Sequence, residues 1–256
     1  MTMAEPFIDD KSKRIALLID GDNAQPSLLG KIMAEAGKYG LVTIRRIYGD
    51  WTTVNMGGWK HVLNENAIQP IQQFRYTIGK NATDSAMIID AMDILHSHLV
   101  DGFCIVSSDS DYTRLATRIR EMGFFVMGIG KQKTPRAFVN ACNIFIYTEN
   151  LAPKEKEREE RKISKKTEAK EEKSKRIDPL PLLKGAFDMA VQEDGWANLA
   201  TIGFYLRQLD PSFDPRTYGF KQLSQLIKNY SHLFELRFQD ETGRTNIYIR
   251  LKEQAE

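Results

Sequence analysis

Apolar positions in residues 14–149 change their spacing in a regular order along the chain. Short continuous apolar runs, typical of strands buried on both faces, alternate with segments whose apolar residues recur every three or four positions, typical of helices. Strands are predicted at 14–20, 68–74, 103–106 and 124–129, at 41–48 from its β-branched residues, with a possible sixth, edge strand at 144–147. Helices are expected at 26–39, 59–66, 83–99, 112–122 and 135–141. This alternation predicts an α/β fold with a doubly wound, mostly parallel sheet in the order 3-2-1-4-5.

The pattern stops at residue 153. Residues 153–176 carry 11 Lys/Arg against 7 Asp/Glu, and their one strongly apolar residue is Ile163. This composition favours a solvated linker, with a tether that contacts RNA directly as the alternative. Beyond it, the spacing predicts helices at 181–193, 199–209 and 220–229, then strands at 234–238 and 247–251 around a turn that contains Gly243. Three helices followed by a hairpin predict a small winged helix-turn-helix.

The predicted organisation is therefore a domain at 1–152, a charged linker at 153–176 and a second domain at 177–256. The net charge of the chain is +2, but residues 1–152 carry 16 Lys/Arg against 16 Asp/Glu, and residues 177–256 carry 9 against 11. Overall charge is therefore weak evidence for a nucleic-acid partner, and any basic footprint has to be local. No apolar run approaches the roughly 20 residues of a membrane helix. The N-terminus has no secretory pattern, so we expect no membrane partner.

The chain has two cysteines, Cys104 and Cys142, and four histidines at unrelated spacings. These numbers give no zinc signature. Both cysteines are expected to be buried thiols in a reducing compartment.

Acidic residues follow or flank the predicted strands at three places. Asp20 ends the first strand, Asp84 opens the third helix, and Asp109 and Asp111 follow the fourth strand. Carboxyl ends of parallel strands share one edge of a sheet, where ligands bind. Carboxylates gathered there repel one another unless a cation lies among them, and oxygen ligands suit Mg²⁺ or Mn²⁺. We therefore expect a divalent-metal site where these three acidic clusters meet.

Each acid also has a simpler interpretation. Asp84, Asp109 and Asp111 lie at helix starts, where a carboxylate caps the helix or offsets its dipole; Asn23 could equally orient a ligand or cap the following helix. Asp90 lies about 120° around the helix from Asp84, which makes it only a candidate for an outer layer of the site. What favours a site is that all three clusters fall on one sheet edge.

A divalent ion held by carboxylates can activate water and stabilise displacement at phosphorus. The sequence therefore predicts phosphodiester hydrolysis. The aromatic and basic loop at 51–60 suits single-stranded nucleic acid, although its two tryptophans could instead anchor the loop to the core. Predicted substrate contacts in this domain are polar or basic residues near the same edge, plus one aromatic: Asn23, Trp51, Lys60, Lys80, Ser107, Ser108, Lys131, Lys133 and Arg136. Their simpler interpretation is that the cations are surface residues and the serines ordinary strand-end hydroxyls.

Residues 13–150 resemble a known family. The segments Asp20-Gly21-Asp22-Asn23, Lys80-Asn81-Ala82-Thr83-Asp84 and Ser107-Ser108-Asp109-Ser110-Asp111-Tyr112 look like the NYN domain, and residues 130–147 look like its bacterial branch. The resemblance implies a PIN-like, Mg²⁺- or Mn²⁺-dependent ribonuclease, most simply an endonuclease in the cytoplasm. Asp20, Asp84 and Asp109 would form its site, assisted by Asp111 and Asn23. Asn143 stands where many relatives carry an aspartate, which predicts a missing metal ligand or an altered metal affinity.

Residues 178–252 resemble the LOTUS domain, also called OST-HTH. The matching segments are residues 180–183, 194–197, 199–209, 210–215 and 218–226. The resemblance implies RNA binding, and in some relatives binding to a protein partner. Tyr218 and Lys221 are expected at the start of the recognition helix, where helix N-termini favour phosphate. Trp196 and Phe220 are expected in the core.

The leading hypothesis is a ribonuclease with an RNA-targeting module. A haloacid dehalogenase-like phosphatase would share the Asp20-Gly21-Asp22 pattern, but that family wants Thr or Val where this chain has Ala24. A catalytically weak RNA-binding adaptor stays open because of Asn143. The RNA target, endo- or exonucleolytic action, one metal or two, and a homodimer are also left open.

Overall fold

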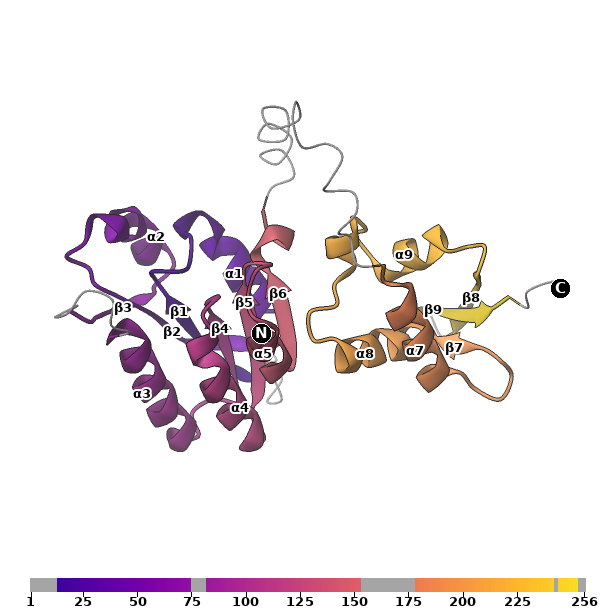
Figure 1. The fold of residues 1–256 in the computed structure, drawn as a ribbon, viewed down its shortest axis with the longest axis horizontal. Coiled ribbons are helices and arrows are strands. Elements are labelled where there is room, and N and C mark those ends of the chain that lie inside the picture. The colour runs from indigo at the N-terminus through magenta and orange to yellow at the C-terminus, as the bar shows by residue number, and fades with distance from the viewer. Residues whose placement is uncertain (1–12, 75–81, 153–177, 242–243, 253–256) are drawn as a thin grey trace, which may run out of the picture. The chain divides into compact units, whose positions relative to one another are not determined.

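The computed structural model describes residues 13–74, 82–152, 178–241 and 244–252. The chain divides into two compact units, Met1–Leu151 and Ala152–Glu256 (Figure 1). Lys80 and the predicted linker at 153–176 lie outside the described residues.

The N-terminal unit contains one parallel sheet in the order β3-β2-β1-β4-β5-β6. Its strands are β1 (Arg14–Asp20), β2 (Leu41–Gly49), β3 (Gln69–Gln72), β4 (Gly102–Val106), β5 (Phe125–Gly130) and β6 (Ile144–Tyr147). The predicted fold class and strand order are confirmed. The sixth strand extends that order by pairing with β5 at the edge.

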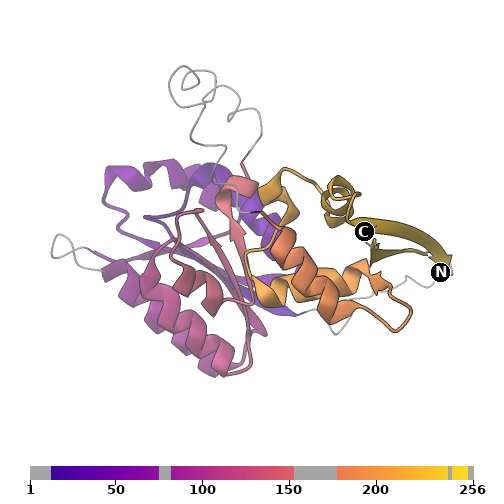
Figure 2. The same cartoon turned by 45° about the vertical axis from the view of Figure 1, so that its right-hand side comes forward.

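Helices cover both faces of this sheet (Figures 1 and 2). They are η1 (Pro26–Leu28), α1 (Leu29–Ala36), η2 (Val54–Trp59), α2 (Lys60–Glu65), α3 (Ala82–Ser97), η3 (Ser110–Tyr112), α4 (Thr113–Glu121), α5 (Arg136–Ala141) and η4 (Thr148–Asn150). Ala16 and Leu18 of β1 pack in one core with α3, α4 and α5. Ile15, Leu17 and Ile19 pack in the other with α1 and α2. Because β1 is buried on both faces, its sequence is continuously apolar.

The described residues of the C-terminal unit form three α-helices and a small antiparallel sheet in the order β7-β9-β8. Its elements are α7 (Leu180–Ala190), β7 (Ala197–Asn198), α8 (Leu199–Leu209), η6 (Pro215–Tyr218), α9 (Leu223–Asn229), β8 (Phe234–Glu241) and β9 (Arg244–Leu251). Helices α7, α8 and α9 share one apolar core with the sheet. This arrangement agrees with the predicted winged helix-turn-helix. Strand β7 was missed because two residues show no periodicity.

The predicted start of the recognition helix is wrong. Helix α9 begins at Leu223, whereas Tyr218 ends the separate turn η6 and Lys221 lies in the loop between them. The Asp214 side chain caps η6 by accepting a hydrogen bond from the Arg216 N–H at 2.8 Å. Gly219 then takes a left-handed conformation with φ 89°, which ends this turn before the helix can start.

Several smaller expectations are confirmed. Trp59 is 1 % exposed, and Trp196 is also buried, while Phe220 packs partly buried against the C-terminal core. Cys104 and Cys142 are buried free thiols, and burial raises the pKa of Cys142 to about 12. Among the described helices, none is long and apolar enough to cross a membrane.

Candidate metal centre

Three carboxylates lie together at the carboxyl edge of the sheet. Asp84, Asp109 and Asp111 each offer an oxygen, and these oxygens lie within 4.8 Å of one another. Asp84 comes from the first turn of α3, and the other two come from the segment that follows β4. The structure groups Asp84 and Asp109 with Asp111 rather than with Asp20. That these residues bind a metal stays a prediction.

Asp109 is at once a helix cap and a member of this cluster. One of its carboxylate oxygens accepts a hydrogen bond from the Asp111 N–H at 3.0 Å, which caps η3. Its own N–H donates to Ser107 Oγ at 3.1 Å. The capping interpretation of Asp109 is therefore correct, and it does not compete with a role in the cluster, because the cap fixes where the carboxylate points.

Tyr112 holds Asp84 in place, and sequence reasoning missed this role. The Tyr112 hydroxyl donates to Asp84 Oδ1 at 2.7 Å. Burial raises the pKa of Tyr112, and the nearby charges of Asp20, Asp84 and Asp109 raise it further, so the phenol keeps its proton and stays a donor. The signal available in the sequence was that Tyr112 directly follows the acidic segment.

The pKa of Asp84 is raised above its usual value. Partial burial is the largest cause, the Tyr112 hydrogen bond acts in the opposite direction, and the charges of Asp20, Asp109 and Asp111 add to the rise. The carboxylate therefore lies in a site where negative charge is already concentrated. A cation bound there would offset this repulsion.

Asp20 lies within electrostatic reach of this cluster, at the end of β1, and is only 1 % exposed. Its Oδ2 accepts hydrogen bonds from Asn23 Nδ2 at 2.7 Å and Ser107 Oγ at 2.8 Å, and its Oδ1 accepts the Asp22 N–H at 3.1 Å. Burial raises the pKa of Asp20, and these donors partly oppose the rise. The Asn23 side chain is thus bonded to the Asp20 carboxylate, and the N-cap position of the following helix is Gln25. A contact of Asn23 with substrate stays a prediction. A direct contact of Asp20 with metal stays a prediction.

Gly21 allows this turn for a steric reason rather than through an unusual φ. A Cβ at Gly21 would lie 2.7 Å from the backbone oxygen of Tyr48 and 2.7 Å from Met56 Cε. The Gly21 N–H donates to that same Tyr48 oxygen at 2.9 Å. The backbone after Asp20 thus packs directly against the end of β2.

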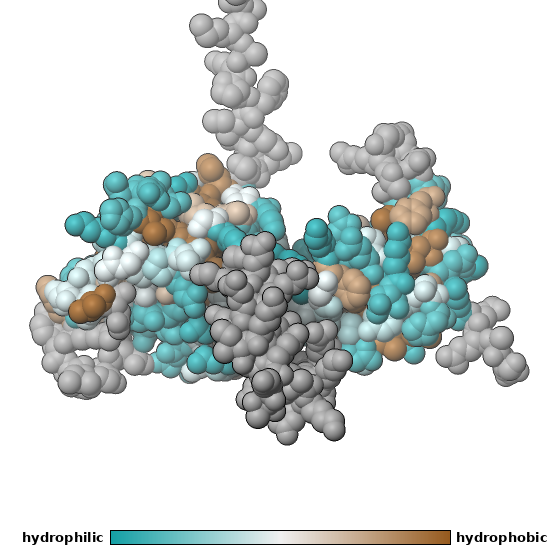
Figure 3. Space-filling model, turned by 90° about the horizontal axis from the view of Figure 1, so that it is seen from above, coloured by the Kyte–Doolittle hydropathy of each residue, from teal (hydrophilic) through white to brown (hydrophobic). Residues whose placement is uncertain are grey.

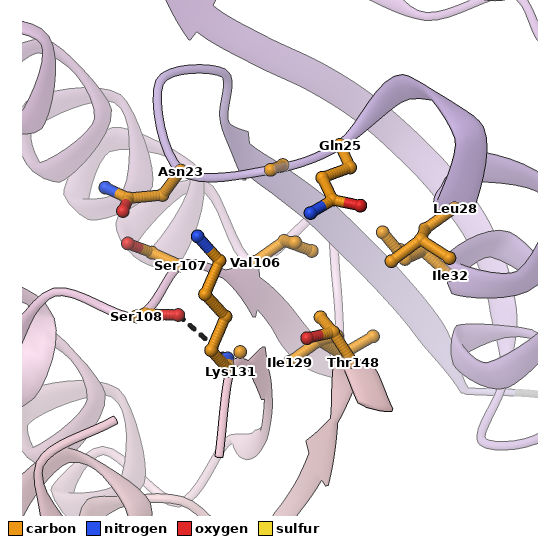
Figure 4. Close-up of a pocket in the computed structure, with 12 residues that line it drawn as sticks. Asn23, Gln25, Leu28, Ile32, Val106, Ser107, Ser108, Ile129, Lys131 and Thr148 are labelled. Carbon is orange, nitrogen blue, oxygen red and sulfur yellow. Dashed lines mark hydrogen bonds between the residues drawn. The ribbon is translucent and has the colours of Figure 1, made fainter. Parts of the chain in front are cut away.

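A small pocket opens beside Asn23 (Figure 4). Ser107, Ser108 and Lys131 also line it, and its volume of about 20 Å³ has room for a single water-sized group. Ser107 uses its proton on Asp20 and accepts the Asp109 N–H, so it joins the two acids. Ser108 Oγ accepts the Lys131 N–H at 2.8 Å. Contacts of both serines and of Lys131 with substrate stay predictions.

The remaining predicted substrate residues are spread along the same edge. Lys133 and Arg136 are exposed in the segment that follows β5. Lys60 is exposed at the start of α2. Trp51 donates its indole N–H to the Ile71 oxygen at 3.0 Å, so it does anchor its loop.

Two residues from the sequence argument belong elsewhere. The Asp90 carboxylate is bonded to the side chains of Arg46 and Tyr48, so it ties α3 to β2. Asn143 Oδ1 accepts the Val126 N–H at 2.8 Å, at the amino end of β5 and therefore at the sheet edge opposite the acids. The expectation that Asn143 replaces a metal ligand is wrong for this reason.

The donor set fits a hard divalent cation. Three carboxylates supply only oxygen ligands, which Mg²⁺ and Mn²⁺ accept. Oxygens bound to one Mg²⁺ lie at most about 4.2 Å apart, since each bond is about 2.1 Å. A small closing movement of these side chains is therefore enough to hold one ion.

A parallel α/β sheet with clustered acids at its carboxyl edge is the arrangement of a PIN-like nuclease domain. The NYN domain family model matches residues 14–150, more than half of the chain, and the chain belongs to this family. The OST-HTH/LOTUS domain model matches residues 173–245. Together they define a nuclease-type domain followed by an RNA-related module, and they set the phosphatase alternative aside.

Solved structures give weaker likenesses. A protein of unknown function from Vibrio parahaemolyticus RIMD 2210633 is 18% identical, over 54% of this chain and 93% of that chain, with a TM-score of 0.45. An uncharacterized protein from Nitrosomonas europaea is 34% identical, over 32% of this chain and 80% of that chain, with a TM-score of 0.29. A Chromobacterium violaceum protein is 31% identical, over 32% of this chain and 89% of that chain, with a TM-score of 0.27. Curated proteins give no match.

We predict that Asp84→Asn uncouples thermal stability from divalent ions. Removing one negative charge relieves repulsion in the cluster, so without metal the variant should unfold about 2–4 °C above the wild type, the shift expected for about 1 kcal/mol. Mn²⁺ should raise the Tm of the wild type, because it binds only the folded chain, and should leave the variant unchanged. Differential scanning calorimetry with and without Mn²⁺ measures both effects.

The matched control is Asp93→Asn, which removes an exposed carboxylate from the same helix. It should respond to Mn²⁺ like the wild type. An equal response in Asp84→Asn would place the bound ion away from the cluster.

Proposed function

We propose that this chain is a divalent-metal-dependent ribonuclease that hydrolyses phosphodiester bonds in single-stranded RNA, and that its C-terminal module binds RNA. The observation that carries the proposal is the group of Asp84, Asp109 and Asp111 within 4.8 Å in an NYN domain. Mg²⁺ or Mn²⁺ as the ion, endonucleolytic cleavage and a cytoplasmic location are further parts of the proposal that rest on the family.

A divalent ion at this cluster would neutralise charge on a phosphodiester and lower the pKa of a bound water. In the hydrolysis, a water oxygen forms a bond to phosphorus, one P–O ester bond breaks, and the leaving oxygen takes up a proton. Asp84 and Asp109 are held ready for this reaction by Tyr112 and by the η3 cap. Such preorganisation matters because carboxylates already in place need no reordering during the reaction.

Lys131 is our candidate for holding the phosphate. It lines the small pocket together with Asn23 and Ser107, whose side chains are bonded to Asp20 (Figure 4). An ammonium group there can form a charge-assisted hydrogen bond to a phosphate oxygen. Lys133, Arg136, Lys60 and Trp51 complete the proposed RNA contacts of the described part of this domain.

The second candidate is an RNA-binding adaptor without activity. Its sequence support was Asn143, and that residue lies at the opposite sheet edge. The C-terminal module, through Tyr218 and Lys221, would bind RNA under either function, and a protein partner of this module or a homodimer is compatible with both.

We predict that Asp109→Asn abolishes metal-dependent RNA cleavage. The substitution keeps an oxygen that can accept the capping hydrogen bond from Asp111 but removes a negative ligand. Activity should fall by more than about 100-fold, because even partners outside the ligand set change metal sites by about 10–100-fold. Cleavage of end-labelled single-stranded RNA in Mn²⁺ or Mg²⁺ measures this, with Asp93→Asn as the control. RNA binding without any cleavage by the wild type would favour the adaptor.

We predict that Lys131→Ala weakens the productive binding of RNA. Loss of one charge-assisted hydrogen bond of about 1.5–3 kcal/mol lowers kcat/KM by about 10-fold or more. The control is Lys38→Ala, which removes a cation paired with Glu35 just before β2, at the far edge of the sheet. Steady-state cleavage kinetics measure kcat/KM of the two variants. Equal kcat/KM in both would contradict a role of Lys131 in holding the phosphate.

A further inference from the structure

A second, much larger pocket lies in the same unit. It is bounded by η2, α2 and the residues around β3, and its volume is about 810 Å³. Ligand pockets in proteins commonly span about 300–1,000 Å³, with an apolar lining and a few placed polar groups. This pocket has room for a nucleotide-sized group and is not used by the chemistry described above.

The lining is largely apolar and carries a few polar side chains. Trp51, Met56, Leu63, Ile68 and Pro70 supply the apolar surface. Val54, also in the lining, is 95% exposed. Apolar side chains otherwise occur as separate patches on a largely polar surface in the view of Figure 3. Val54 therefore presents apolar surface at the pocket without covering it.

The polar groups suit a nucleotide. Lys60 is the one charged residue among the described residues of the lining, and Thr53, Asn64 and Gln72 add a hydroxyl and two amides. The Asn64 amide can hydrogen-bond a base edge, and Lys60 can pair with phosphate, whereas the Gln72 amide already bonds to Trp51 and Asp50. No carboxylate in this lining would repel an RNA strand.

Met56 lies between this pocket and the turn that follows Asp20. A Cβ at Gly21 would lie 2.7 Å from Met56 Cε, and one at Gly49 would lie 2.3 Å from the same atom. The tip of Met56 therefore packs against the turn that directly follows Asp20, while Met56 also lines the pocket. This contact connects the pocket lining to the turn that carries Asp20.

The aromatic wall is fixed in position before any ligand binds. The Trp51 indole N–H donates to the Ile71 oxygen at 3.0 Å, and its backbone N–H donates to Gln72 Oε1 at 3.0 Å. Gln72 Nε2 in turn donates to Asp50 Oδ1 at 3.1 Å. A preorganised aromatic wall reduces the entropy cost of binding a planar group.

We propose that this pocket binds one unpaired nucleobase of the RNA strand whose phosphodiester lies at the acidic centre. Trp51 and Met56 contact the base, and Lys60 pairs with a phosphate beside it. This inference rests on the proposed function, and it names the place where the enzyme holds a base next to the bond that it cuts.

Gly57 offers a way to fill the pocket without disturbing the core. It lines the pocket, and a Cβ built on it meets no atom within 4 Å. Gly57→Phe places a ring in the space, whereas Gly57→Ala leaves most of it empty. The matched control is Gly30→Phe, at an exposed glycine of α1 that also has open space at its Cβ and does not line the pocket.

The test uses the full chain in EDTA, so that cleavage does not interfere. A short single-stranded RNA that contains 4-thiouridine is bound to the protein, and the complex is irradiated. Mass spectrometry then identifies the cross-linked peptide. We expect the RNA to cross-link to residues within 51–72 in the wild type, in Gly57→Ala and in Gly30→Phe. Gly57→Phe should lose them and bind this RNA about 10-fold more weakly, the effect of losing one stacked base.

Unchanged cross-links and affinity in Gly57→Phe would overturn the inference and leave the pocket to another occupant, such as an apolar side chain of a protein. The wild type could cleave RNA and Asp109→Asn fail to, while Gly57→Phe keeps both cleavage and normal RNA binding. That result would reject the base pocket and keep the ribonuclease. Pocket cross-links in a chain that never cleaves would keep the pocket and reject the ribonuclease.

Discussion

Repulsion between carboxylates at the edge of the parallel sheet is the constraint on which the site depends. Carboxylate oxygens of Asp84, Asp109 and Asp111 lie within 4.8 Å of one another. Burial is the largest cause of the raised pKa of Asp84, and the charges of Asp20, Asp109 and Asp111 raise it further. The fold holds them there with donors: Tyr112 for Asp84, Ser107 and Asn23 for Asp20, and the η3 backbone for Asp109. A divalent cation is the simplest partner for such an arrangement.

Two side chains, Ser107 and Met56, connect the Asp20 turn to its surroundings. Ser107 joins β1 to the segment after β4 by donating to Asp20 and accepting from Asp109, so adjacent strands share one hydroxyl. Met56 packs beneath the Asp20 turn and also lines the large pocket. Ser107 and Met56 thereby connect the Asp20 turn to the acidic segment after β4 and to the lining of the large pocket.

The sequence predicted those features that depend on local pattern. Continuous apolar runs placed the central strands, because strands buried on both faces need apolar residues throughout. The ends of the predicted strands placed Asp20 and Asp109 on one edge. Interactions between distant residues had no such signal. Asp90 bonds to Arg46 and Tyr48 across 44 and 42 positions, and Asn143 bonds to Val126 at the other edge. Likewise, the start of α9 was misplaced because the left-handed Gly219 ends η6, and the large pocket is built from three elements that no single periodicity describes.

The most direct test of the account is to locate the ion. Crystals of the full chain grown with Mn²⁺ should show an anomalous scattering peak bonded to carboxylate oxygens of Asp84, Asp109 and Asp111, and the same experiment on Asp109→Asn should show none there. A wild-type peak held by other residues, or an empty cluster at saturating Mn²⁺, would contradict the claim that these carboxylates are gathered to bind metal.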